Sequence, residues 1–374
     1  MKLPDGWRKV LISDAFHIQL GKMLSPNAKI GEQCPYVTNF NVRWGYFHLQ
    51  QVNFMAFSEK EKEKYQLKKG DLLICEGGEI GRCAIWDKDH SGYYYQKSLH
   101  RLRPKNNLIF PPFLYHELRY LCLTRKLLNL VGESSIAHLP KEKLASVQIL
   151  CPSLPEQRRI AEFLGTWDEA IEKLERLIAA KEKQQKVLSN HIFGQVKKQK
   201  FQQCRLVNIC TIHKGVQLGK LKMNAEGRYP VLNGGISYSG YTDSHNCEAN
   251  TIAISEGGNS CGFVNLIREK FWCGGHCYTL KNIRISMQYL FFFLKHRQDM
   301  LMNLRVGSGL PNIQKKDLEN VEVVFPIMEE EQNLFSEILL CTQNELDLLR
   351  KKLAALQKQK RGLVQKLLTG TWRV

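Results

Sequence analysis

The chain lacks the long apolar runs that mark a membrane-spanning or secreted protein. Its longest aromatic and apolar run, residues 289–294, is far shorter than the roughly 20 residues needed to cross a bilayer. The first seven residues, MKLPDGW, contain no apolar segment of the kind found in signal peptides. We therefore expect a soluble, cytoplasmic protein.

Acidic residues are in short supply relative to basic ones. The 374 residues include 36 Asp and Glu against 54 Lys and Arg, which gives a formal net charge of +18. Such a chain attracts polyanions, and the attraction weakens as salt rises. Nucleic acid is the expected partner. An acidic membrane surface is the weaker alternative, because neither a basic amphipathic face nor a lipid anchor is visible.

Residue patterns of catalysis are also missing. Phe110-Pro111-Pro112-Phe113 lacks the polar first residue with which methyltransferase motifs hold the target amine, so it is interpreted as an extended lead into a helix. Asp87-Lys88-Asp89 is a charged turn without a matching carboxylate partner. The pairs Gly77-Gly78 and Gly257-Gly258 have no lysine at P-loop spacing and indicate tight turns. We predict no catalytic residues and no cofactor bound by this chain.

Cysteine is abundant, with 12 residues, but its spacing does not indicate a metal site. Outside a secretory context these thiols are expected to be reduced. Cys273-Gly274-Gly275-His276-Cys277 brings three possible zinc ligands together, with Cys247 and Cys261 upstream. The spacing is not that of a CxxC pair, so core packing and no metal are predicted, and a structural zinc site is the alternative.

An internal repeat sets the organisation of the chain. The second half repeats the first at an offset of 174 residues, which becomes 175 beyond the proline that precedes each helix. Glu156-Gln157 thus falls on Glu331-Gln332. Upstream the repeat is looser, and Glu76-Gly77-Gly78 returns there as Glu256-Gly257-Gly258. Each half is predicted to be a globular part followed by a long helix. Further matching positions are Ser134, Ser135, Ile136, Leu139, Leu144 and Val147 with Ser308, Gly309, Leu310, Ile313, Leu318 and Val321.

Both predicted helices carry a seam of apolar residues at alternating steps of four and three, as in a coiled coil. Sixteen of the twenty seam positions are apolar in a chain that is 43% hydrophobic, so the period is not accidental. The seam positions are Ile160, Leu164, Trp167, Ile171, Leu174, Ile178, Lys181, Gln185, Leu188 and Ile192, and then Phe335, Leu339, Thr342, Leu346, Leu349, Leu353, Leu356, Lys360, Leu363 and Leu367.

The helix ends and the polar seam positions have structural interpretations. Ser153 and Glu156 have capping-box spacing, and Glu329-Glu330-Glu331 suits the positive end of a helix dipole. Gln185 and Lys360 share one seam position, where a polar residue commonly fixes register. A helix of about 38 residues is roughly 57 Å long, enough to set a distance between two domains. A coiled coil that only dimerises the protein is the alternative.

The globular parts are expected to be α/β (α+β) domains. Residues 71–75, 251–255 and 321–325 are typical of buried strands between glycine turns. Residues 111–130 and 286–304 are predicted to be helices that cover those strands.

Exposed loops rich in basic, amide and aromatic residues are the expected nucleic-acid contacts, with phosphate contacts positioning and base contacts specifying. They lie at residues 22–29, 39–46, 82 and 93–97, and at 214–222, 233–241 and 259–260. The candidates are Lys22, Lys29, Arg43, Trp44, Tyr46, Arg82, Tyr94, Gln96, Lys97, Lys214, Gln217, Lys220, Lys222, Asn233, Ser237, Tyr238, Tyr241, Asn259 and Ser260.

The arrangement resembles the specificity subunit of type I restriction-modification systems over nearly the whole chain. The motifs that carry the resemblance are Pro4-Asp5-Gly6-Trp7, Gly70-Asp71-Leu72-Leu73-Ile74 before Gly77-Gly78 and Gly81, Pro152-Ser153-Leu154-Pro155-Glu156-Gln157, and the segment KRGLVQKLLTG at residues 360–370. The resemblance implies two target recognition domains, residues 1–152 and 197–326. It also implies two antiparallel coiled-coil spacer helices, residues 153–196 and 327–374, the latter with the C-terminal tail.

The resemblance further implies a non-catalytic subunit that binds double-stranded DNA together with two methyltransferase subunits and with restriction subunits. S-adenosylmethionine, ATP and Mg are expected on those partners. The second helix start departs from the first, because Pro326-Ile327-Met328-Glu329-Glu330-Glu331-Gln332 has one extra acid and no second proline. The recognition domains differ in length, so an asymmetric split target is predicted. A coiled-coil scaffold that binds a polyanion without sequence specificity is the alternative function.

Overall fold

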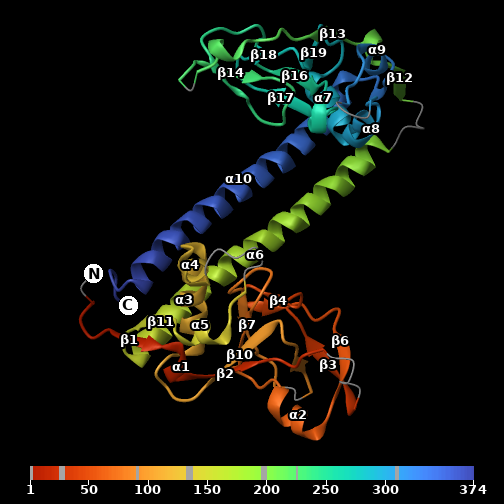
Figure 1. The fold of residues 1–374 in the computed structure, drawn as a ribbon. Helices are drawn as coiled ribbons and strands as arrows, with labels where there is room; N and C mark the ends of the chain where they lie inside the picture. Colours follow the sequence, from red (N-terminus) through yellow and green to blue (C-terminus); the bar gives the residue numbers. More distant parts are fainter. Residues whose placement is uncertain are drawn as a thin grey trace. The chain divides into compact units, whose positions relative to one another are not determined.

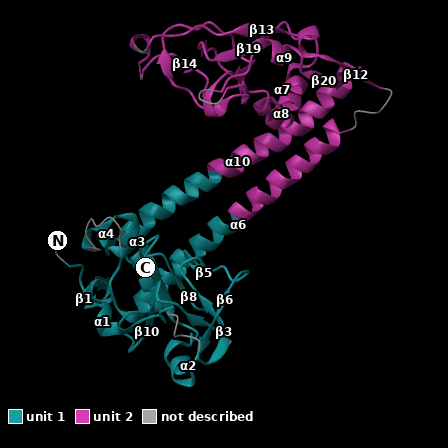
Figure 2. Ribbon diagram, turned by 45° about the vertical axis from the view of Figure 1, so that its right-hand side comes forward, with its two compact units in different colours: residues 1–174, 352–374 teal, residues 175–351 magenta. Residues whose placement is uncertain are grey.

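The computed structural model describes residues 3–24, 30–89, 92–131, 138–194, 200–224, 226–307 and 311–374. The candidate Lys29 and the repeat positions Ser134, Ser135, Ile136, Ser308, Gly309 and Leu310 lie outside them. The chain forms two compact units, Met1–Leu174 with Lys352–Val374, and Glu175–Lys351 (Figure 2). The helices α6 (Leu154–Phe193) and α10 (Glu329–Leu368) each contribute a segment to both units. The domain boundaries predicted from the sequence stay predictions.

The first domain comprises the elements of the first unit from β1 to β11 (Figure 1). Its sheets have the strand orders β2-β10-β7-β8, β6-β3-β9, β1-β11 and β4-β5. The strands are β1 (Arg8–Leu11), β2 (Phe16–Leu20), β3 (Glu32–Val37), β4 (Val42–Arg43), β5 (Tyr46–Phe47), β6 (Asn53–Phe57), β7 (Leu72–Cys75), β8 (Cys83–Ile85), β9 (Tyr94–Tyr95), β10 (Leu99–Pro104) and β11 (Gln148–Cys151). The helices are α1 (Ile12–Ala15), α2 (Glu59–Tyr65), α3 (Pro111–Leu123), α4 (Lys126–Val131) and α5 (Lys141–Ala145).

The second domain comprises the elements of the second unit from β12 to β20 and repeats this plan. Its sheets have the orders β13-β19-β16-β17, β15-β14-β18 and β12-β20. The strands are β12 (Phe201–Arg205), β13 (Thr211–Lys214), β14 (Tyr229–Leu232), β15 (Gly240–Thr242), β16 (Thr251–Ser255), β17 (Val264–Ile267), β18 (Trp272–Cys273), β19 (Cys277–Lys281) and β20 (Glu322–Pro326). The helices are α7 (Met287–His296), α8 (Gln298–Asn303) and α9 (Lys315–Glu319), with 3-10 turns η1 (Leu206–Asn208), η2 (Lys220–Lys222) and η3 (Gly258–Ser260).

The central strands are buried on both faces, which explains their unbroken apolar sequence. In β7, Leu72 and Ile74 pack into the core under α3, and Leu73 and Cys75 into a second cluster around Trp86. Successive side chains of a strand point to opposite faces, so each strand serves two cores. The predicted strand at 251–255 is confirmed, and those at 71–75 and 321–325 are confirmed to within one residue.

Both predicted covering helices exist, but each is two helices rather than one. The first breaks at Arg125, which has a left-handed φ of 58° between α3 and α4. The second breaks at Arg297, and the carbonyl oxygen of the next side chain, Gln298, accepts the backbone N–H of Val264 at 3.1 Å. The bond between Gln298 and Val264 could not be seen in the apolar spacing. None of the helices in the described part of the chain is long and apolar enough to span a bilayer.

A buried glutamine explains why Glu-Gln is repeated at the start of both long helices. The side-chain oxygen of Gln157 accepts the backbone N–H of Phe110 at 2.8 Å, and that of Gln332 accepts the N–H of Ser286 at 2.8 Å. Their amide groups donate to the carbonyl oxygens of Pro152 at 3.1 Å and Pro326 at 2.7 Å. Each glutamine thus ties the start of a long helix to the residue before the covering helix.

The neighbouring Glu156 does not act as the predicted capping-box residue. Both of its carboxylate oxygens accept bonds from the guanidinium of Arg373 in the C-terminal tail. The first turn of α10 does hold Glu329, Glu330 and Glu331, as predicted.

All twenty predicted seam positions are buried or partly buried. Within the second unit, Gln185 donates to Thr342 at 3.3 Å and to Gln343 at 3.2 Å, while Glu182 pairs with Arg350 at 2.6 Å. Rising numbers on α6 meet falling numbers on α10, so the two segments are antiparallel. Within the first unit, Lys360 pairs with Asp168. These two polar contacts are equivalent by the repeat, because 185 + 175 = 360 and 168 + 175 = 343.

Candidate nucleic-acid interface

In the first domain, Arg82 joins two loops on the end of the central sheet. Its guanidinium donates to the carbonyl oxygen of Asn39 at 2.7 Å and to the carboxylate of Glu79 at 2.8 Å. The other oxygen of Glu79 accepts the indole N–H of Trp44 at 2.7 Å. Two predicted DNA contacts, Arg82 and Trp44, therefore hold the 39–44 loop against the turn after β7. This assigns them a positioning role that the sequence did not reveal.

Other side chains around these loops project into solvent. Phe40 is 77% exposed and Tyr46 is 56% exposed, and Lys97 is exposed as well. Arg43 is partly buried and donates to the carbonyl oxygens of Phe40 and Val42. Tyr46 and Lys97 are therefore exposed, as expected, although Tyr46 begins strand β5 rather than lying in a loop. Phe40, which was not a candidate, is exposed as well.

Besides Arg43, Trp44 and Arg82, which are partly buried, three further candidates of the first domain are not exposed. Lys22 is 4% exposed, because its ammonium donates to the carbonyl oxygen of Ala56 at 2.6 Å and to Glu61 at 2.7 Å. Tyr94 is 5% exposed and stacks on Phe57 with ring centroids 4.4 Å apart. The side-chain oxygen of Gln96 accepts the backbone N–H of Ser98, and the residue is partly buried. The expectation of exposure was wrong for Lys22 and Tyr94, which belong to the core around α2.

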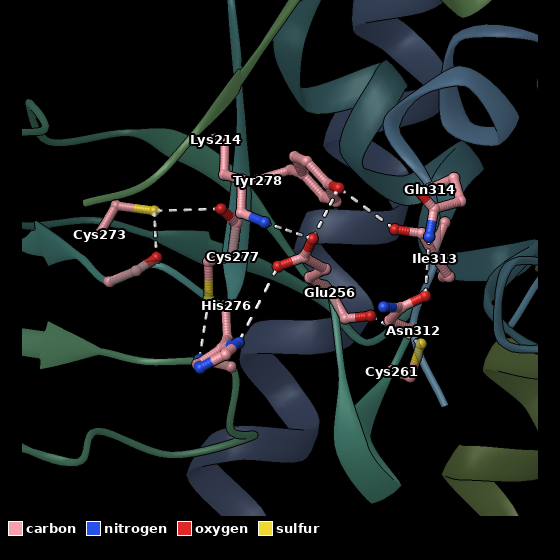
Figure 3. Close-up of polar contacts among 12 residues, drawn as sticks. Lys214, Glu256, Cys261, Cys273, His276, Cys277, Tyr278, Asn312, Ile313 and Gln314 are labelled. Atoms are coloured by element: carbon pink, nitrogen blue, oxygen red, sulfur yellow. Dashed lines mark hydrogen bonds and ion pairs between the residues drawn. The ribbon is translucent and has the colours of Figure 1, made fainter. Parts of the chain in front are cut away.

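In the second domain, polar side chains converge on Glu256 at the end of β16 (Figure 3). One carboxylate oxygen, Oε1, accepts from Lys214 Nζ at 2.7 Å and from Tyr278 Oη at 2.9 Å. The other oxygen, Oε2, lies 4.0 Å from Nδ1 of His276. Burial, and next the bond to Glu256, raises the pKa of Tyr278, so its hydroxyl remains a donor.

The predicted loop residues Gln217, Asn233 and Ser260 lie around the same cluster. A Cβ atom on Gly274 would come within 2.3 Å of Asn233 Oδ1, and one on Gly275 within 2.9 Å of Gln217 Oε1. A side chain at either glycine would have to displace them, so Gly274 and Gly275 let Asn233 and Gln217 lie directly on the backbone. Ser260 donates to the carbonyl oxygen of Gly234 at 2.5 Å. Ser260 thus ties its turn to the 233–241 loop, and Gln217 is exposed while Asn233 and Ser260 are partly buried.

The remaining candidates of the second domain are mostly exposed. Tyr238 is 38% exposed and donates to Glu269 at 3.1 Å; burial and this bond raise its pKa to about 12. Tyr241 is 39% exposed. Lys220 lies in η2, and its side chain is outside the described part of the structure. Exposed candidates are also Lys214, Gln217, Lys222, Ser237 and Asn259.

The cysteines of the second domain agree with the core-packing interpretation. Cys247, Cys273 and Cys277 are buried with Leu232 and Phe271 in a small apolar cluster. Cys277 Sγ accepts the backbone N–H of Gly234 at 3.0 Å. Among the described residues, no group of three or more His, Cys, Asp or Glu residues could hold a metal ion.

The residues that organise both interfaces are two glutamates, Glu79 and Glu256, which were not predicted. The repeated Glu-Gly-Gly was a usable signal for Glu256. Its glycines do form turns as predicted, since Gly78 has φ 75° and Gly258 has φ 72°. The glutamate before them was not a candidate, because the candidates were basic, amide, hydroxyl and aromatic residues.

Comparison with known sequences identifies the family. The family model described as type I restriction modification DNA specificity domain matches residues 4–182 and 198–358. A type I specificity subunit of Mycoplasma genitalium is 32% identical over 139 residues, 36% of each chain. The specificity subunit of the MjaX restriction enzyme of Methanocaldococcus jannaschii is 24% identical over 84% of this chain and 81% of its own. The matched segments span about a third of the two Mycoplasma relatives, 36% and 32% of their lengths.

Solved structures share the fold. The S subunit of a type I restriction-modification system from M. genitalium aligns over 98% of both chains with a TM-score of 0.72 at 20% identity. A chain from a study of complex assembly and conformational transition of the type I R-M system aligns over 98% of this chain and 99% of its own, with a TM-score of 0.60 at 18% identity. Because the family model matches both halves and most of the chain, this protein belongs to the type I restriction-modification DNA specificity family.

Proposed function

We propose that this chain is the DNA-reading subunit of a type I restriction-modification complex, in which each domain reads one half of a split target. The observation that supports the proposal most is that one strand order occurs twice with different loops. The first domain inserts the β4–β5 hairpin and α2, whereas the stretches 233–239 and 243–250 of the second domain hold neither a hairpin nor a helix. The same framework with unlike loops is suited to reading two unlike half-sites.

The proposed contacts are the exposed residues of these loops. Lysines would approach phosphates, whose counterion release makes binding salt-dependent, and amide and aromatic side chains would face bases. In the first domain we propose Tyr46 and Lys97, and with them the partly buried Arg43. In the second domain we propose Gln217, Lys222, Ser237, Tyr238, Tyr241 and Asn259, and not Lys214, because its ammonium already donates to Glu256.

We propose further that the chain is not catalytic and acts with methyltransferase and restriction subunits. S-adenosylmethionine, ATP and Mg would then be bound by those partners. Support comes from the family, and from the structural similarity to a chain studied for the assembly of a type I complex. α6 and α10 each have 40 residues, which is the length expected of helices that act as spacers between two half-sites.

The test is to co-express the chain with the methyltransferase subunit of its own system and to map methylated bases across a genome by single-molecule sequencing. The expected result is one split motif with unlike halves and a constant gap. A soluble complex that yields no motif would contradict the proposal and favour a scaffold that binds polyanions without sequence specificity. Methylation by the chain alone, with S-adenosylmethionine, would contradict its non-catalytic role.

A further inference from the structure

Glu256 is held more rigidly than a surface glutamate. Its backbone N–H donates to the carbonyl oxygen of His276 at 2.8 Å, and its carbonyl oxygen accepts the N–H of Ile313 at 2.8 Å and the thiol of Cys261 at 2.9 Å. The residue is only 8% exposed. Both the main chain and the carboxylate are therefore fixed before any ligand arrives.

The two carboxylate oxygens of Glu256 have different surroundings. Oε1 is occupied by Lys214 and Tyr278, as Figure 3 shows, whereas Oε2 is approached by His276 at 4.0 Å, beyond hydrogen-bond distance. The His276 side chain is 63% exposed and the Lys214 side chain 54% exposed. Oε2 is thus an acceptor at the open side of the cluster, and a small displacement of the exposed imidazole leaves it free to a ligand.

The charge of this acceptor restricts the ligand. A carboxylate repels phosphate, so it is not a backbone contact, and in a chain of net charge +18 it stands out on a surface proposed to face DNA. Lys214 compensates its charge from the side. In the major groove the base-edge donors are the exocyclic amino groups of cytosine (N4) and adenine (N6), and Glu or Asp typically accepts from cytosine N4.

We propose that Glu256 is a specificity-determining residue that accepts a hydrogen bond from the amino group of a base, cytosine in the first instance, in the half-site read by the second domain. This rests on the proposed function of the chain. Lys214 and Tyr278 are positioning residues, because they fix Oε1 and so aim Oε2 outward.

Comparison with the first domain supports the assignment of this role to the half-site of the second domain alone. Its Glu76 occupies the matching loop, and the N–H of Leu139 bonds to the Glu76 carbonyl oxygen as that of Ile313 does to Glu256. The position equivalent to Tyr278 is His100, which is directed at the carbonyl oxygen of Leu139 at 2.8 Å. The position equivalent to Lys214 is Leu20. The orienting donors of Glu256 are therefore particular to the second domain.

The test compares the methylation motifs of complexes carrying wild-type chain, Glu256→Gln and the matched control Glu76→Gln. Glutamine keeps an acceptor for Lys214 and Tyr278 but offers an amino group in place of one oxygen. The expected result for E256Q is a loss of about 5- to 150-fold in preference for the amino-bearing base at one position of one half-site. The other half-site and the gap stay unchanged, and E76Q leaves that position unchanged.

The outcomes separate the inference from the proposed function. A wild-type complex without a split motif contradicts the function itself. A normal wild-type motif that E256Q reads with unchanged preference at every base contradicts the inference, as does a uniform loss of methylation with no base change. A shifted position shows whether cytosine or adenine was read. Tyr278→Phe, which keeps the ring, is expected to weaken preference at the same position but less than E256Q does.

Discussion

The two domains share their strand order but differ in how they join the long helices. In the first unit, Asp168 on α6 accepts from Arg119 of α3 at 2.7 Å and pairs with Lys360 of α10. In the second unit, the equivalents of Asp168 and Lys360 are Gln343 and Gln185, which share a neutral hydrogen bond of 3.2 Å. The same contact between α6 and α10 is thus an ion pair in the first unit and an amide hydrogen bond in the second. The shared fold depends on buried apolar faces and on the hydrogen bonds of Gln157 and Gln332, which we call the glutamine clamps. It tolerates either an ion pair or an amide pair between the helices.

The largest expected effect comes from breaking the ionic version. Lys360 and Arg119 hold the pKa of Asp168 below its ordinary value against the opposing effect of burial. Asp168→Asn leaves the ammonium of Lys360, whose side chain is 8% exposed, without its counter-charge. We expect a loss of about 3–4 kcal/mol, measured by hydrogen exchange in the first unit while the second stays unchanged.

The matched control introduces the neutral amide pair of the second unit into the first unit. Asp168→Gln combined with Lys360→Gln recreates the amide pair of the second unit, and it should recover most of the stability lost in D168N. A double variant as unstable as D168N would show that the two crossings are not equivalent.

Next in size is the loss of the glutamine clamps. Gln157→Leu leaves the N–H of Phe110 and the carbonyl oxygens of Leu108 and Pro152 without their partner, whereas Gln332→Leu leaves the N–H of Ser286 and the carbonyl oxygen of Pro326. At about 1 kcal/mol for each group, the expected losses are about 3 and about 2 kcal/mol. Urea unfolding followed by hydrogen exchange would measure both. Equal losses, or a loss in the other unit, would contradict this account.

A third difference lies within the covering helices. Glu117 of α3 and Phe293 of α7 are both seven residues beyond the clamped N–H, and both are buried. One oxygen of Glu117 has no hydrogen-bond partner among the described residues, and burial raises its pKa well above 4.5. The folded state therefore favours the protonated acid, so stability is fully present below pH 4.5 and is lost as pH rises towards the raised pKa.

Glu117→Leu is consequently expected to stabilise the first unit at pH 8 by about 1–2 kcal/mol, with little gain at pH 4. Thermal unfolding at the two pH values measures this. Phe293→Leu serves as the control, because it should destabilise the second unit equally at both. A gain for E117L that is independent of pH would show that the carboxyl is not the cause.

The framework was predictable because buried apolar patterns repeat. The long helices, the 251–255 strand and the Glu-Gln repeat were all visible, since each depends on local spacing. The breaks at Arg125 and Arg297 were not, because the apolar pattern continues through both, although Arg125 has a left-handed φ and Gln298 beside Arg297 bonds to Val264. A helix period says where a side chain faces and not where the helix stops.

The interface was predictable only in part, because residue type does not reveal the partner of a side chain. Lys22 and Tyr94 are residue types typical of DNA contacts, yet both are buried, where Lys22 pairs with Glu61 of α2 and Tyr94 of β9 stacks on Phe57. Glu79 and Glu256 have the wrong charge for phosphate, yet they organise the loops. Burial and geometry separate these cases, and neither is contained in the composition of a loop.

The smallest expected effect tests exposed ion pairs against the buried one. Lys181 and Glu345 join α6 and α10 at 2.8 Å in the second unit, with side chains 32% and 45% exposed. Because water already solvates both groups, Glu345→Gln should cost less than about 1 kcal/mol. That cost should vanish in molar salt, whereas the cost of D168N should persist, since screening acts weakly on buried charges. Hydrogen exchange at low and high salt measures both. An E345Q effect as large and as salt-resistant as that of D168N would mean that ion pairs, rather than the apolar seam, hold the helices of the second unit together.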